Sequence, residues 1–464
     1  MTIGAVVLAA GQGTRMRSAL PKVLHPVAGR PMITWVLDAL AAAGAARTVV
    51  VVGHGAESVE AALPEGVAAA RQEEQLGTGH AARTGLAALD PACETVVVAC
   101  GDTPLITAEL VGELIGAQVG SGRGATLATA VVDDAGAYGR IVRAPDGSVS
   151  AIVEAREATP EQLALGEYNA GLYVADRARL EAALGRLEAG AHGGELYLTD
   201  AVSDLGAPAW PLVVDDPMVA AGVNDRAELA GCEAVVQARL REALMRDGVS
   251  MPDPGAVYLE AGVRVAEDTV LLPGTHLRGS TRIAGGCTIG PDVTIVDSEV
   301  GPGSEILRAH VLSSVVGEGC NIGPFAYLRP GSRLERGAKV GTFVELKNTT
   351  LRPRSKVPHL SYMGDATVGE GTNIGAGNIT ANYDGFRKHR TEIGARVKTG
   401  SDCVFVAPVT VGDDAMTGAG SIITDHVPDG ALGIARARQS NIEGFTEKAA
   451  ARAAEAAEAK GGRG

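Results

Sequence analysis

The chain is poor in aromatic residues and in positive charge. Phe, Trp and Tyr make up only 3% of its 464 residues, so we do not expect stacking of bases on aromatic rings to dominate ligand recognition. The formal net charge is −14. This charge argues against a surface for nucleic acid or anionic membrane, although local basic sites for phosphates are compatible with it. We therefore expect neither nucleic acid nor membrane among its partners.

Cysteine and long hydrophobic runs are also scarce. The six cysteines form no CxxC motif, which excludes a disulfide framework and a thiolate metal site. No stretch approaches the length of a membrane span. The apolar run at residues 3–10 has no positive region before it and no cleavage pattern after it, so it predicts a first β-strand rather than a leader. We expect a soluble, cytoplasmic protein.

What the sequence does have is a period of six in its second half. Aliphatic or similar residues recur every sixth position in three runs: Val265, Leu271, Leu277, Ile283, Ile289 and Ile295; Val316, Ile322, Leu328, Leu334, Val340 and Leu346; Ile393, Thr399, Phe405, Val411 and Thr417. The residue four positions later is small: Cys287, Val293, Cys320, Ala326, Ser332, Ala338, Val344, Cys403, Val409, Ala415 and Ser421. Six fits neither an α-helix nor an ordinary strand. It predicts short strands that alternate with tight corners, with three hexads to a coil and coils stacked about 4.8 Å apart, which is a parallel β-helix.

The repeat resembles the hexapeptide-repeat proteins, which are mostly trimeric acyltransferases. The resemblance implies a left-handed coil and a homotrimer. Because the end strands of such a coil are unpaired edges, caps and partners are expected. The period alone does not separate an acyltransferase from an inert trimerising prism. The chemistry must come from positions where the repeat fails.

The first 225 residues alternate strand-like and helix-like runs. We predict strands at 4–10, 48–52, 95–100 and 125–132, and helices at 33–43, 56–63, 78–89 and 109–119. Apolar strands with helices between them predict an α/β domain with a doubly wound, mostly parallel sheet. Ligands bind such sheets at the carboxyl ends of the strands, where Gly11, Gly53 and Gly101 lie.

The domain boundaries follow from changes of pattern. An apolar stripe, an N-cap residue and a terminating glycine predict a linker helix over residues 226–248: Leu229, Cys232, Val236, Leu240 and Leu244; Asp225; Gly248. The nucleotide domain then covers 1–225 and the β-helix 249–443. The Ala-rich charged tail, 444–464, is expected to be a frayed helix or disordered.

A glycine-rich turn follows the first strand. Residues 8–16 read LAAGQGTRM, and Pro21 and Lys22 follow. Backbone N–H groups of such a turn can approach phosphate oxygens, while arginine and lysine supply charge. The turn is neither a Walker A loop nor the GxGxxG fingerprint. The whole string resembles the sugar-nucleotidyltransferase family, the pyrophosphorylases that make nucleotide sugars.

More residues match that family in order. The resemblance implies that Asp102 and Asn224 hold Mg2+, that Gly139, Glu154 and Asn169 hold the sugar, and that Arg15 and Lys22 contact the triphosphate. The same resemblance assigns the remaining nucleotide contacts to Leu8, Ala9, Ala10, Gly11, Gln72, Gly77, Thr78 and Gly101. Taken singly, Asp102 could be only a turn residue and Asn224 only a residue ahead of a helix. Cys100 departs from the tyrosine of several relatives.

The hexads lapse between Leu346 and Val368, and again between Ile379 and Ile393. These gaps contain the string PHLSYMGD at 358–365 and NYDG at 382–385. With both sets of motifs in order, residues 3–445 resemble the bacterial family of bifunctional N-acetylglucosamine-1-phosphate uridylyltransferases/glucosamine-1-phosphate acetyltransferases. That family supplies precursor for peptidoglycan and lipopolysaccharide. It uses acetyl-CoA, UTP and Mg2+.

The resemblance also assigns the acetyl-transfer site. An amine attacks a thioester only when it is unprotonated, which requires a base, and His359 is the candidate catalytic residue. Arg329, Lys347, Tyr362 and Asn373 would hold the sugar phosphate. Acetyl-CoA would contact Ala376, Asn382, Tyr383, Ser401, Ala419 and Arg436. The segment 397–399 departs from the aromatic residue often seen there.

Two alternatives stay open at this point. A lone histidine at a β-helix corner is ordinarily a solvated surface residue. The chain could then be a single-activity nucleotide-sugar pyrophosphorylase with a structural or regulatory β-helix, as in ADP-glucose pyrophosphorylases. A purely structural trimer with both sites inactive is the third class. UTP-dependent release of pyrophosphate and acetyl-CoA-dependent loss of the amine separate the three.

Overall fold

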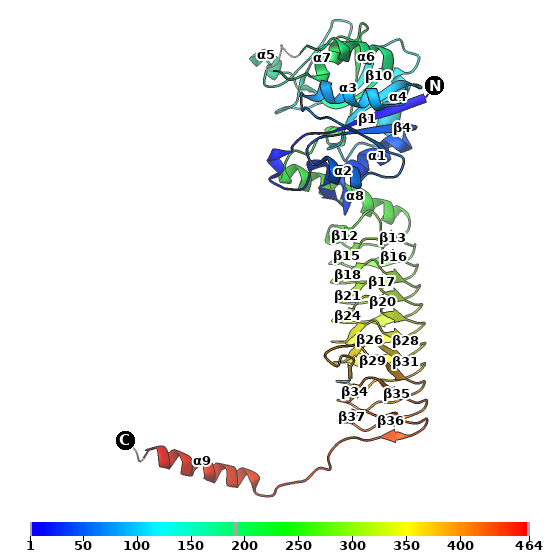
Figure 1. Cartoon of the computed structure of the whole chain (residues 1–464), viewed down its shortest axis with the longest axis vertical. Helices are drawn as coiled ribbons and strands as arrows, with labels where there is room; N and C mark the ends of the chain where they lie inside the picture. The colour runs from blue at the N-terminus through cyan, green and yellow to red at the C-terminus, as the bar shows by residue number, and fades with distance from the viewer. Residues whose placement is uncertain (1, 189–193, 462–464) are drawn as a thin grey trace. The chain divides into compact units, whose positions relative to one another are not determined.

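The computed structural model describes residues 2–188 and 194–461 and divides into two compact units (Figure 1). One unit holds the chain up to Gly248 together with Asp253–Val263 and His276–Ser280. The other holds Val249–Pro252, Arg264–Thr275 and the chain from Thr281 onward. Within the described ranges, no helix is both long enough and apolar enough to cross a membrane.

The first unit contains a nine-stranded sheet in the order β5-β4-β1-β6-β10-β7-β11-β9-β8. Its parallel half consists of β1 (Thr2–Ala9), β4 (Arg47–Val52), β5 (Ala68–Arg71) and β6 (Cys93–Cys100). The other half consists of β7 (Ala125–Val131), β8 (Arg140–Arg143), β9 (Val149–Val153), β10 (Glu167–Asp176) and β11 (Ala209–Val213). The four predicted strands are β1, β4, β6 and β7. The antiparallel pairing of β10 with β6 and β7 was not predicted.

Helices cover both faces of this sheet, as a doubly wound fold requires. The predicted helices are α1 (Met32–Ala42), α2 (Ala56–Ala61), α3 (Thr78–Ala88) and α4 (Ala108–Gln118). Alternate residues of β1 enter different cores: Ala5 and Val7 pack with α1 and α4, whereas Val6 packs with α3. This alternation is the period-two geometry of a strand buried on both sides.

Shorter elements complete the unit. They are η1 (Thr14–Met16), η2 (Lys22–Leu24), β2 (Pro26–Val27), β3 (Arg30–Pro31), α5 (Pro160–Leu163), α6 (Arg177–Gly185), α7 (Leu198–Ser203) and η3 (Pro217–Ala220). A long helix, α8 (Arg226–Arg246), follows where the linker helix is expected. The side chain of Asp225 caps it by accepting hydrogen bonds from the backbone of Ala227 and Glu228. After α8, η4 spans Pro254–Ala256.

The remaining strands wind into a parallel β-helix with three faces, named here A, B and C. Face A consists of β12 (Val257–Leu259), β15 (Thr275–Arg278), β18 (Val293–Val296), β21 (Ala309–Leu312), β24 (Ala326–Leu328), β27 (Glu345–Lys347), β30 (Tyr362–Gly364), β32 (Ile379–Ala381), β34 (Val404–Val406) and β37 (Ile422–Ile423). Face B consists of β13 (Arg264–Val265), β16 (Arg282–Ile283), β19 (Glu299–Val300), β22 (Val315–Val316), β25 (Arg333–Leu334), β28 (Thr350–Leu351), β31 (Ala366–Val368), β33 (Thr391–Ile393) and β35 (Val409–Val411). Face C consists of β14 (Val270–Leu271), β17 (Thr288–Ile289), β20 (Glu305–Ile306), β23 (Asn321–Ile322), β26 (Lys339–Thr342) and β29 (Lys356–His359), and single bridges at Asn373 and Lys398 continue it to β36 (Met416–Thr417) and β38 (Leu432–Gly433).

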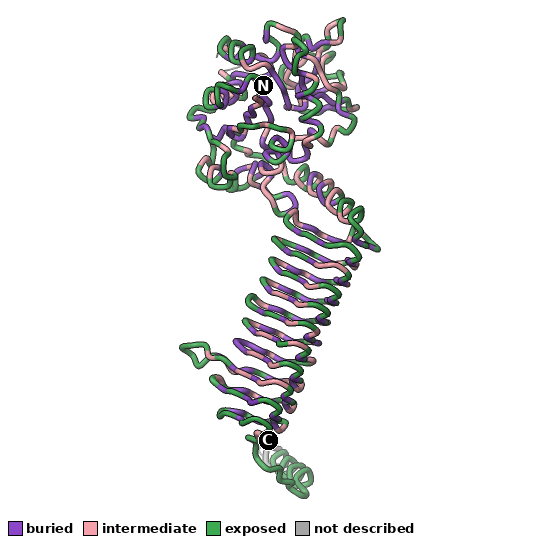
Figure 2. The backbone as a smooth tube through the Cα atoms, turned by 90° about the vertical axis from the view of Figure 1, so that its right-hand side faces the viewer, coloured by how far each residue is buried: buried purple, intermediate pink, exposed green. Residues whose placement is uncertain are grey.

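The hexad prediction is confirmed residue by residue. Every member of the three predicted runs and every predicted small residue is buried. Successive strands pair in parallel and in register, as Ile283 with Val300 and Val300 with Val316 do. Figure 2 shows the resulting alternation of buried and exposed positions along the stacked coils.

The two lapses of the repeat have different structural outcomes. Between Leu346 and Val368 the coil continues without a break, and Thr342 pairs with His359 across β26 and β29. Between Ile379 and Ile393 the chain leaves the coil, and residues 383–388 are all exposed. A loop that stands out from the coils is visible in Figure 2. The tail forms helix α9 (Phe445–Gly461), while 462–464 lie outside the described residues.

Candidate active sites

A cavity of about 460 Å³ opens at the carboxyl ends of β1 and β6. Most of the predicted nucleotide-site residues line it: Leu8, Ala9, Ala10, Gly11, Lys22, Gln72, Gly77, Thr78, Asp102 and Glu154. The predicted residues absent from the lining are Arg15, Gly101, Gly139, Asn169 and Asn224. Residues from distant parts of the chain therefore meet at this cavity, because they follow strands that end at the same edge of the sheet.

The Lys22 ammonium lies near two side-chain oxygens at one end of this cavity. The ammonium of Lys22, on η2, forms an ion pair with Asp102 and lies 3.4 Å from the side-chain oxygen of Asn224. A backbone hydrogen bond holds these two oxygen-bearing residues close together. The N–H of Val223, the residue before Asn224, donates to the carbonyl of Asp102 at 2.8 Å. A carboxylate and an amide oxygen that converge on one positive charge are the ligands that Mg2+ prefers. The residues therefore fit a magnesium ion, with Lys22 as a second positive charge beside it.

The segment with the predicted nucleotide contacts Gln72, Gly77 and Thr78 is held rigidly. Gln72 is buried, and its amide nitrogen donates to the carbonyl of Gly77 at 3.2 Å. Gly77 has a φ of 99°, and a Cβ there would lie 2.6 Å from the carbonyl oxygen of Leu196. The Thr78 hydroxyl accepts a hydrogen bond from the N–H of Leu198 at 3.0 Å. Only glycine fits at position 77, so the segment packs tightly against residues 196–198.

Glu154 and Asn169 differ in how they reach the cavity. The Glu154 carboxylate lines the cavity and accepts a hydrogen bond from Thr199 at 3.1 Å, and burial raises its pKa. The Asn169 amide donates to the Tyr173 hydroxyl at 2.5 Å, and its oxygen accepts from the N–H of Gly171 at 3.2 Å. The backbone N–H of Asn169 donates to the Gly139 carbonyl at 2.8 Å. Asn169 and Gly139 are thus joined to one another, while Glu154 faces the cavity.

The cavity wall also contains residues that were not predicted from the sequence, among them Arg156, Glu195 and Tyr197. Arg156 forms an ion pair with Glu195, and its guanidinium lies 4.9 Å from the ring centroid of Tyr197. All three line the cavity beside Glu154. They come from segments about forty residues apart, which are joined only when α7 packs on β9. No local pattern marked them.

Cys100 lies in the cavity wall, whereas Arg15 does not. Cys100 lines the cavity, and burial, followed by the charge of Asp102, raises the pKa of its thiol to about 12. The thiol is therefore neutral near pH 7 and fills space rather than acting as a nucleophile. Arg15 lies on η1 and is exposed outside the cavity wall.

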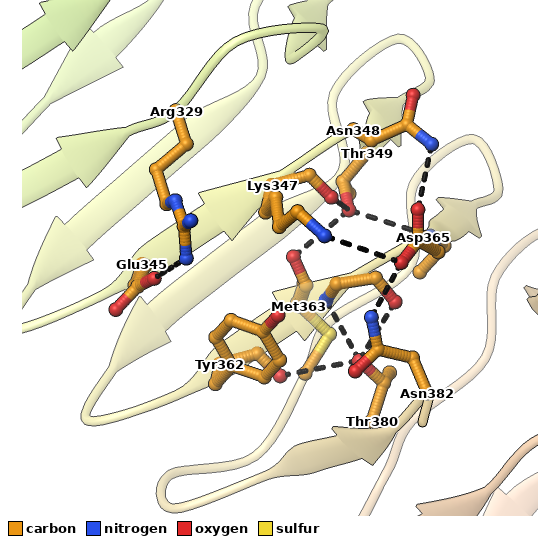
Figure 3. A network of polar contacts seen from close by, with 12 residues as sticks. Arg329, Glu345, Lys347, Asn348, Thr349, Tyr362, Met363, Asp365, Thr380 and Asn382 are labelled. Carbon is orange, nitrogen blue, oxygen red and sulfur yellow. Dashed lines mark hydrogen bonds and ion pairs between the residues drawn. The ribbon is translucent and has the colours of Figure 1, made fainter. Parts of the chain in front are cut away.

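The second candidate site begins at the corner between faces A and B. Figure 3 shows Arg329, Lys347, Asp365 and Asn382 there. Arg329 pairs with Glu345 at 2.9 Å, and Lys347 lies 3.8 Å from Asp365. Burial alone would raise the pKa of Asp365, but hydrogen bonds from the amides of Asn348 and Asn382, with the nearby positive charge of Lys347, hold it below its usual range. Asp365 thus anchors both Lys347 and Asn382.

The projecting loop adds a second lysine to this corner. Lys388 lies beside Lys347, and this contact is the largest cause of the lowered pKa of Lys347. Burial lowers this pKa further, whereas the negative charge of Asp365 raises it. Two ammonium groups and the guanidinium of Arg329 at one corner form a favourable site for phosphate. Tyr362 lies next to them on β30 (Figure 3). Lys388 was not among the predicted site residues, because it lies in the loop that leaves the hexad repeat.

Three of the predicted acetyl-CoA residues, Ala376, Ser401 and Ala419, lie along the next corner, between faces C and A, whereas Asn382 and Tyr383 follow β32 on face A. The N–H of Gly377 donates to the carbonyl of His359 at 3.3 Å, and the N–H of Asp402 donates to the carbonyl of Ala376 at 2.7 Å. The N–H of Gly420 then donates to the carbonyl of Ser401 at 2.8 Å. His359, Ala376, Ser401 and Ala419 therefore follow one another on successive coils, and Arg436 lies beyond Gly420.

Within one chain, His359 is separated from the corner that holds Arg329, Lys347 and Asp365. Its side chain is exposed, and no described residue makes a side-chain hydrogen bond or ion pair with its ring. The strand between the corners, β30 (Tyr362–Gly364), spans roughly 10 Å at about 3.3 Å per residue. Asn373 is exposed on face C, and Tyr383 is exposed on the loop, where its hydroxyl donates to the carbonyl of Gly385 at 2.6 Å. One chain does not bring all of these predicted residues together.

Comparison with known proteins matches both halves of the chain. Residues 5–196 match the model of the MobA-like NTP transferase domain. Curated proteins described as bifunctional protein GlmU match nearly the whole chain. Those from Mycobacterium sp. (strain KMS) and Mycolicibacterium vanbaalenii are 47% identical over 97% and 96% of this chain and 94% and 92% of their own lengths. The protein from Mycobacterium tuberculosis (strain H37Ra) is 45% identical over 96% of this chain and 92% of its own length.

Proposed function

Because the chain belongs to the family of bifunctional GlmU proteins, we propose that its two reactions use the two sites described above. The chain is a bifunctional transferase. It acetylates the amine of glucosamine 1-phosphate with acetyl-CoA, and it couples the resulting N-acetylglucosamine 1-phosphate to UTP with release of pyrophosphate. We assign the coupling to UTP to residues 1–225 and the acetylation to residues 249–443. Residues 226–248 connect these two parts. We also propose that the enzyme acts in the cytoplasm.

Uridylyl transfer needs positioning and charge rather than a protein nucleophile. An oxygen of the sugar phosphate attacks the α-phosphorus of UTP, and pyrophosphate leaves. Gln72 reads the uracil edge and Glu154 holds the sugar. Lys22 neutralises charge on the phosphates, and Arg15 reaches them from η1. Asp102 and Asn224 would hold Mg2+, which when bound supplies further neutralisation. The single observation that carries this assignment is the Lys22 ammonium between the oxygens of Asp102 and Asn224.

Acetyl transfer needs a base at the amine. In this proposal His359 takes the amine proton, Arg329, Lys347 and Lys388 hold the sugar phosphate, and Tyr362 and Asn373 orient the sugar. Acetyl-CoA follows Ala376, Ser401 and Ala419 toward Arg436, with Asn382 and Tyr383 at its side. Loss of the free amine that depends on acetyl-CoA distinguishes this enzyme from a single-activity pyrophosphorylase. An intact amine after incubation with acetyl-CoA would favour the single-activity alternative.

We further propose a homotrimer in which neighbouring copies complete the acetyl-transfer site. Phe325 and Phe343 stack 5.3 Å apart at the C–A corner, yet they remain 51% and 59% exposed. Leu360, on the next coil beside His359, is 62% exposed. These three exposed apolar side chains form a continuous column on successive coils. The whole chain has only five phenylalanines, so two of them stacked on the surface indicate a surface that a partner covers. A second copy is the occupant, because it can supply the phosphate-binding corner that lies roughly 10 Å from His359 in one chain.

Replacing Phe343 by glutamate should therefore dissociate the enzyme. We expect a monomer by size-exclusion chromatography with light scattering, a loss of acetyl transfer of roughly 10²-fold or more because orientation of the reactants is lost, and unchanged uridylyl transfer. Val131→Glu is the matched control, since Val131 is 58% exposed on a strand of the other unit. A monomeric Phe343→Glu enzyme with full acetyltransferase activity would contradict the shared site.

The uridylyl half should act alone. We expect a fragment of residues 1–247 to couple UTP and N-acetylglucosamine 1-phosphate, because all residues assigned to that site precede residue 248. This fragment loses the two buried hydrogen bonds between Gln237 and Leu259, of 2.6 and 3.0 Å. A fragment of residues 1–280 keeps them and should be more stable by roughly 1–3 kcal/mol, the usual net contribution of two hydrogen bonds. Urea unfolding and coupling rates of both fragments check this. An inactive but folded 1–280 fragment would contradict the assignment.

A further inference from the structure

The projecting loop brings Lys388 to the corner of Lys347, although the side chains of this loop are not buried. Residues 383–388 are all exposed, and Phe386 is 93% exposed. Burial of apolar surface therefore does not fix the path of the loop. The ammonium groups of Lys347 and Lys388 also repel one another. Polar contacts within the loop must hold Lys388 at the corner.

The base of the loop is a short hairpin tied to the β-helix. Tyr383 and Lys388 form an antiparallel bridge. The N–H of His389 donates to the carbonyl of Asn382 at 2.9 Å. The side-chain amide of Asn382 in turn donates to the carboxylate of Asp365 (Figure 3). The two ends of the hairpin are therefore joined to each other and to the corner.

The carboxylate of Asp384 organises the rest of the hairpin. Its Oδ1 accepts hydrogen bonds from the N–H groups of Phe386 and Arg387, both at 2.7 Å. Its Oδ2 lies 2.7 Å from Nε2 of His389. An aspartate that accepts bonds from the backbone two and three residues later stabilises a turn. These contacts lower the pKa of Asp384 to about 2, with the N–H of Arg387 as the largest cause, so the carboxylate is ionised at neutral pH.

Lys388 lies between the two residues that Asp384 holds on its far side, Arg387 and His389. The charge of Lys388 also contributes to the lowered pKa of Asp365, which agrees with its position at the corner. An exposed ion pair by itself contributes little to stability. Here, however, one carboxylate binds both neighbours of Lys388, so it restricts the backbone on each side of the lysine.

We propose that Asp384 and His389 are positioning residues for acetyl transfer, which hold Lys388 where it binds the phosphate of the acceptor, glucosamine 1-phosphate. This inference rests on the proposed acetyl transfer. Asp384 and His389 do not touch the substrate; they act through Lys388. Their loss should therefore weaken binding of the acceptor and leave the chemical step intact.

The test measures steady-state acetyl transfer by Asp384→Ala, His389→Ala and Lys388→Met. We expect each to raise the KM for glucosamine 1-phosphate roughly threefold to tenfold, the size of one charge-assisted contact at a partly exposed site. The kcat should stay at the wild-type level for Asp384→Ala and His389→Ala, since a contact made equally in ground and transition states changes KM alone. The double variant Asp384→Ala/Lys388→Met should match Lys388→Met, because Asp384 acts only through the lysine.

The matched control is Asp413→Ala. Asp413 is another exposed carboxylate of the β-helix that accepts a backbone hydrogen bond, from the N–H of Ala395 at 2.8 Å, and its loss should leave every KM unchanged. Uridylyl transfer and thermal unfolding of all the variants should match the wild type, which excludes misfolding.

Four results would each overturn the proposal. They are an unchanged KM in any of the three single variants, a fall in kcat without a rise in KM, an equal rise in the KM for acetyl-CoA, and a full further rise when Asp384→Ala is added to Lys388→Met. A wild-type enzyme that leaves the amine intact would instead overturn acetyl transfer itself.

Discussion

Replacing Asp102 by alanine is expected to lower uridylyl transfer by at least about 10²–10³, the usual loss when one group that stabilises developing charge is removed. The carboxylate of Asp102 shares a cation position with Asn224 and carries the only formal negative charge of that pair. Without it, Mg2+ would lose its proposed charged ligand, and Lys22 loses its ion-pair partner. Release of pyrophosphate from UTP and N-acetylglucosamine 1-phosphate measures the loss.

Two comparisons make this result specific. Acetyl transfer by the Asp102→Ala enzyme should be unchanged, because that reaction uses no residue of this cavity. Asp90→Ala is the control, since Asp90 is an exposed carboxylate of the same unit, 3.8 Å from Arg47. Near-normal coupling by the Asp102 variant would remove Asp102 from the metal site.

The second large effect concerns His359. His359→Ala should lower the turnover of acetyl transfer by roughly 10²–10⁴, the usual contribution of a general base. The Michaelis constant for glucosamine 1-phosphate should change little, because the proposed phosphate ligands Arg329 and Lys347 are unchanged in this variant. Uridylyl transfer should be unaffected. The conversion of the free amine, followed at saturating acetyl-CoA, is the measurement.

The pH profile separates a base from a binding residue. A base must be neutral to accept a proton, so the wild-type rate should rise as pH increases through the ionisation of the histidine, and the variant should lose that limb. His426→Ala is the control, since His426 is another exposed histidine of the β-helix and its ring contacts the carbonyl of Thr410 at 3.2 Å. A His359 variant with normal turnover and only a raised Michaelis constant would place the base elsewhere.

The sequence predicts the parts of the fold that rest on a local period. The hexads place Ile289, Leu328 and Val411 inside the coil, and all three are fully buried. The alternation of strands and helices likewise predicts β1, α1 and β4. The antiparallel strand β10 was missed, because its position between β6 and β7 depends on a long connection that leaves no periodic signal.

The site residues also divide into those predicted from a local pattern and those that depend on long-range packing. Residues that directly follow a strand, such as Gly11 and Asp102, lie in the cavity wall because strand ends meet at one edge of the sheet. Arg156 and Glu195 were missed, since their meeting depends on the packing of α7 on β9. Lys388 reaches Lys347 from a loop whose path the sequence does not specify. The distance of His359 from Lys347 also follows only from the order of the three faces.

Incubation of the full-length enzyme with glucosamine 1-phosphate, acetyl-CoA, UTP and Mg2+, with each component omitted in turn, tests the central claim most directly. UDP-N-acetylglucosamine should form only in the complete mixture. Omission of UTP should leave N-acetylglucosamine 1-phosphate, and omission of acetyl-CoA should leave the amine unmodified. Omission of Mg2+ should stop coupling but not acetylation. Formation of the nucleotide sugar from supplied N-acetylglucosamine 1-phosphate, with no acetylation of glucosamine 1-phosphate, would contradict a bifunctional enzyme.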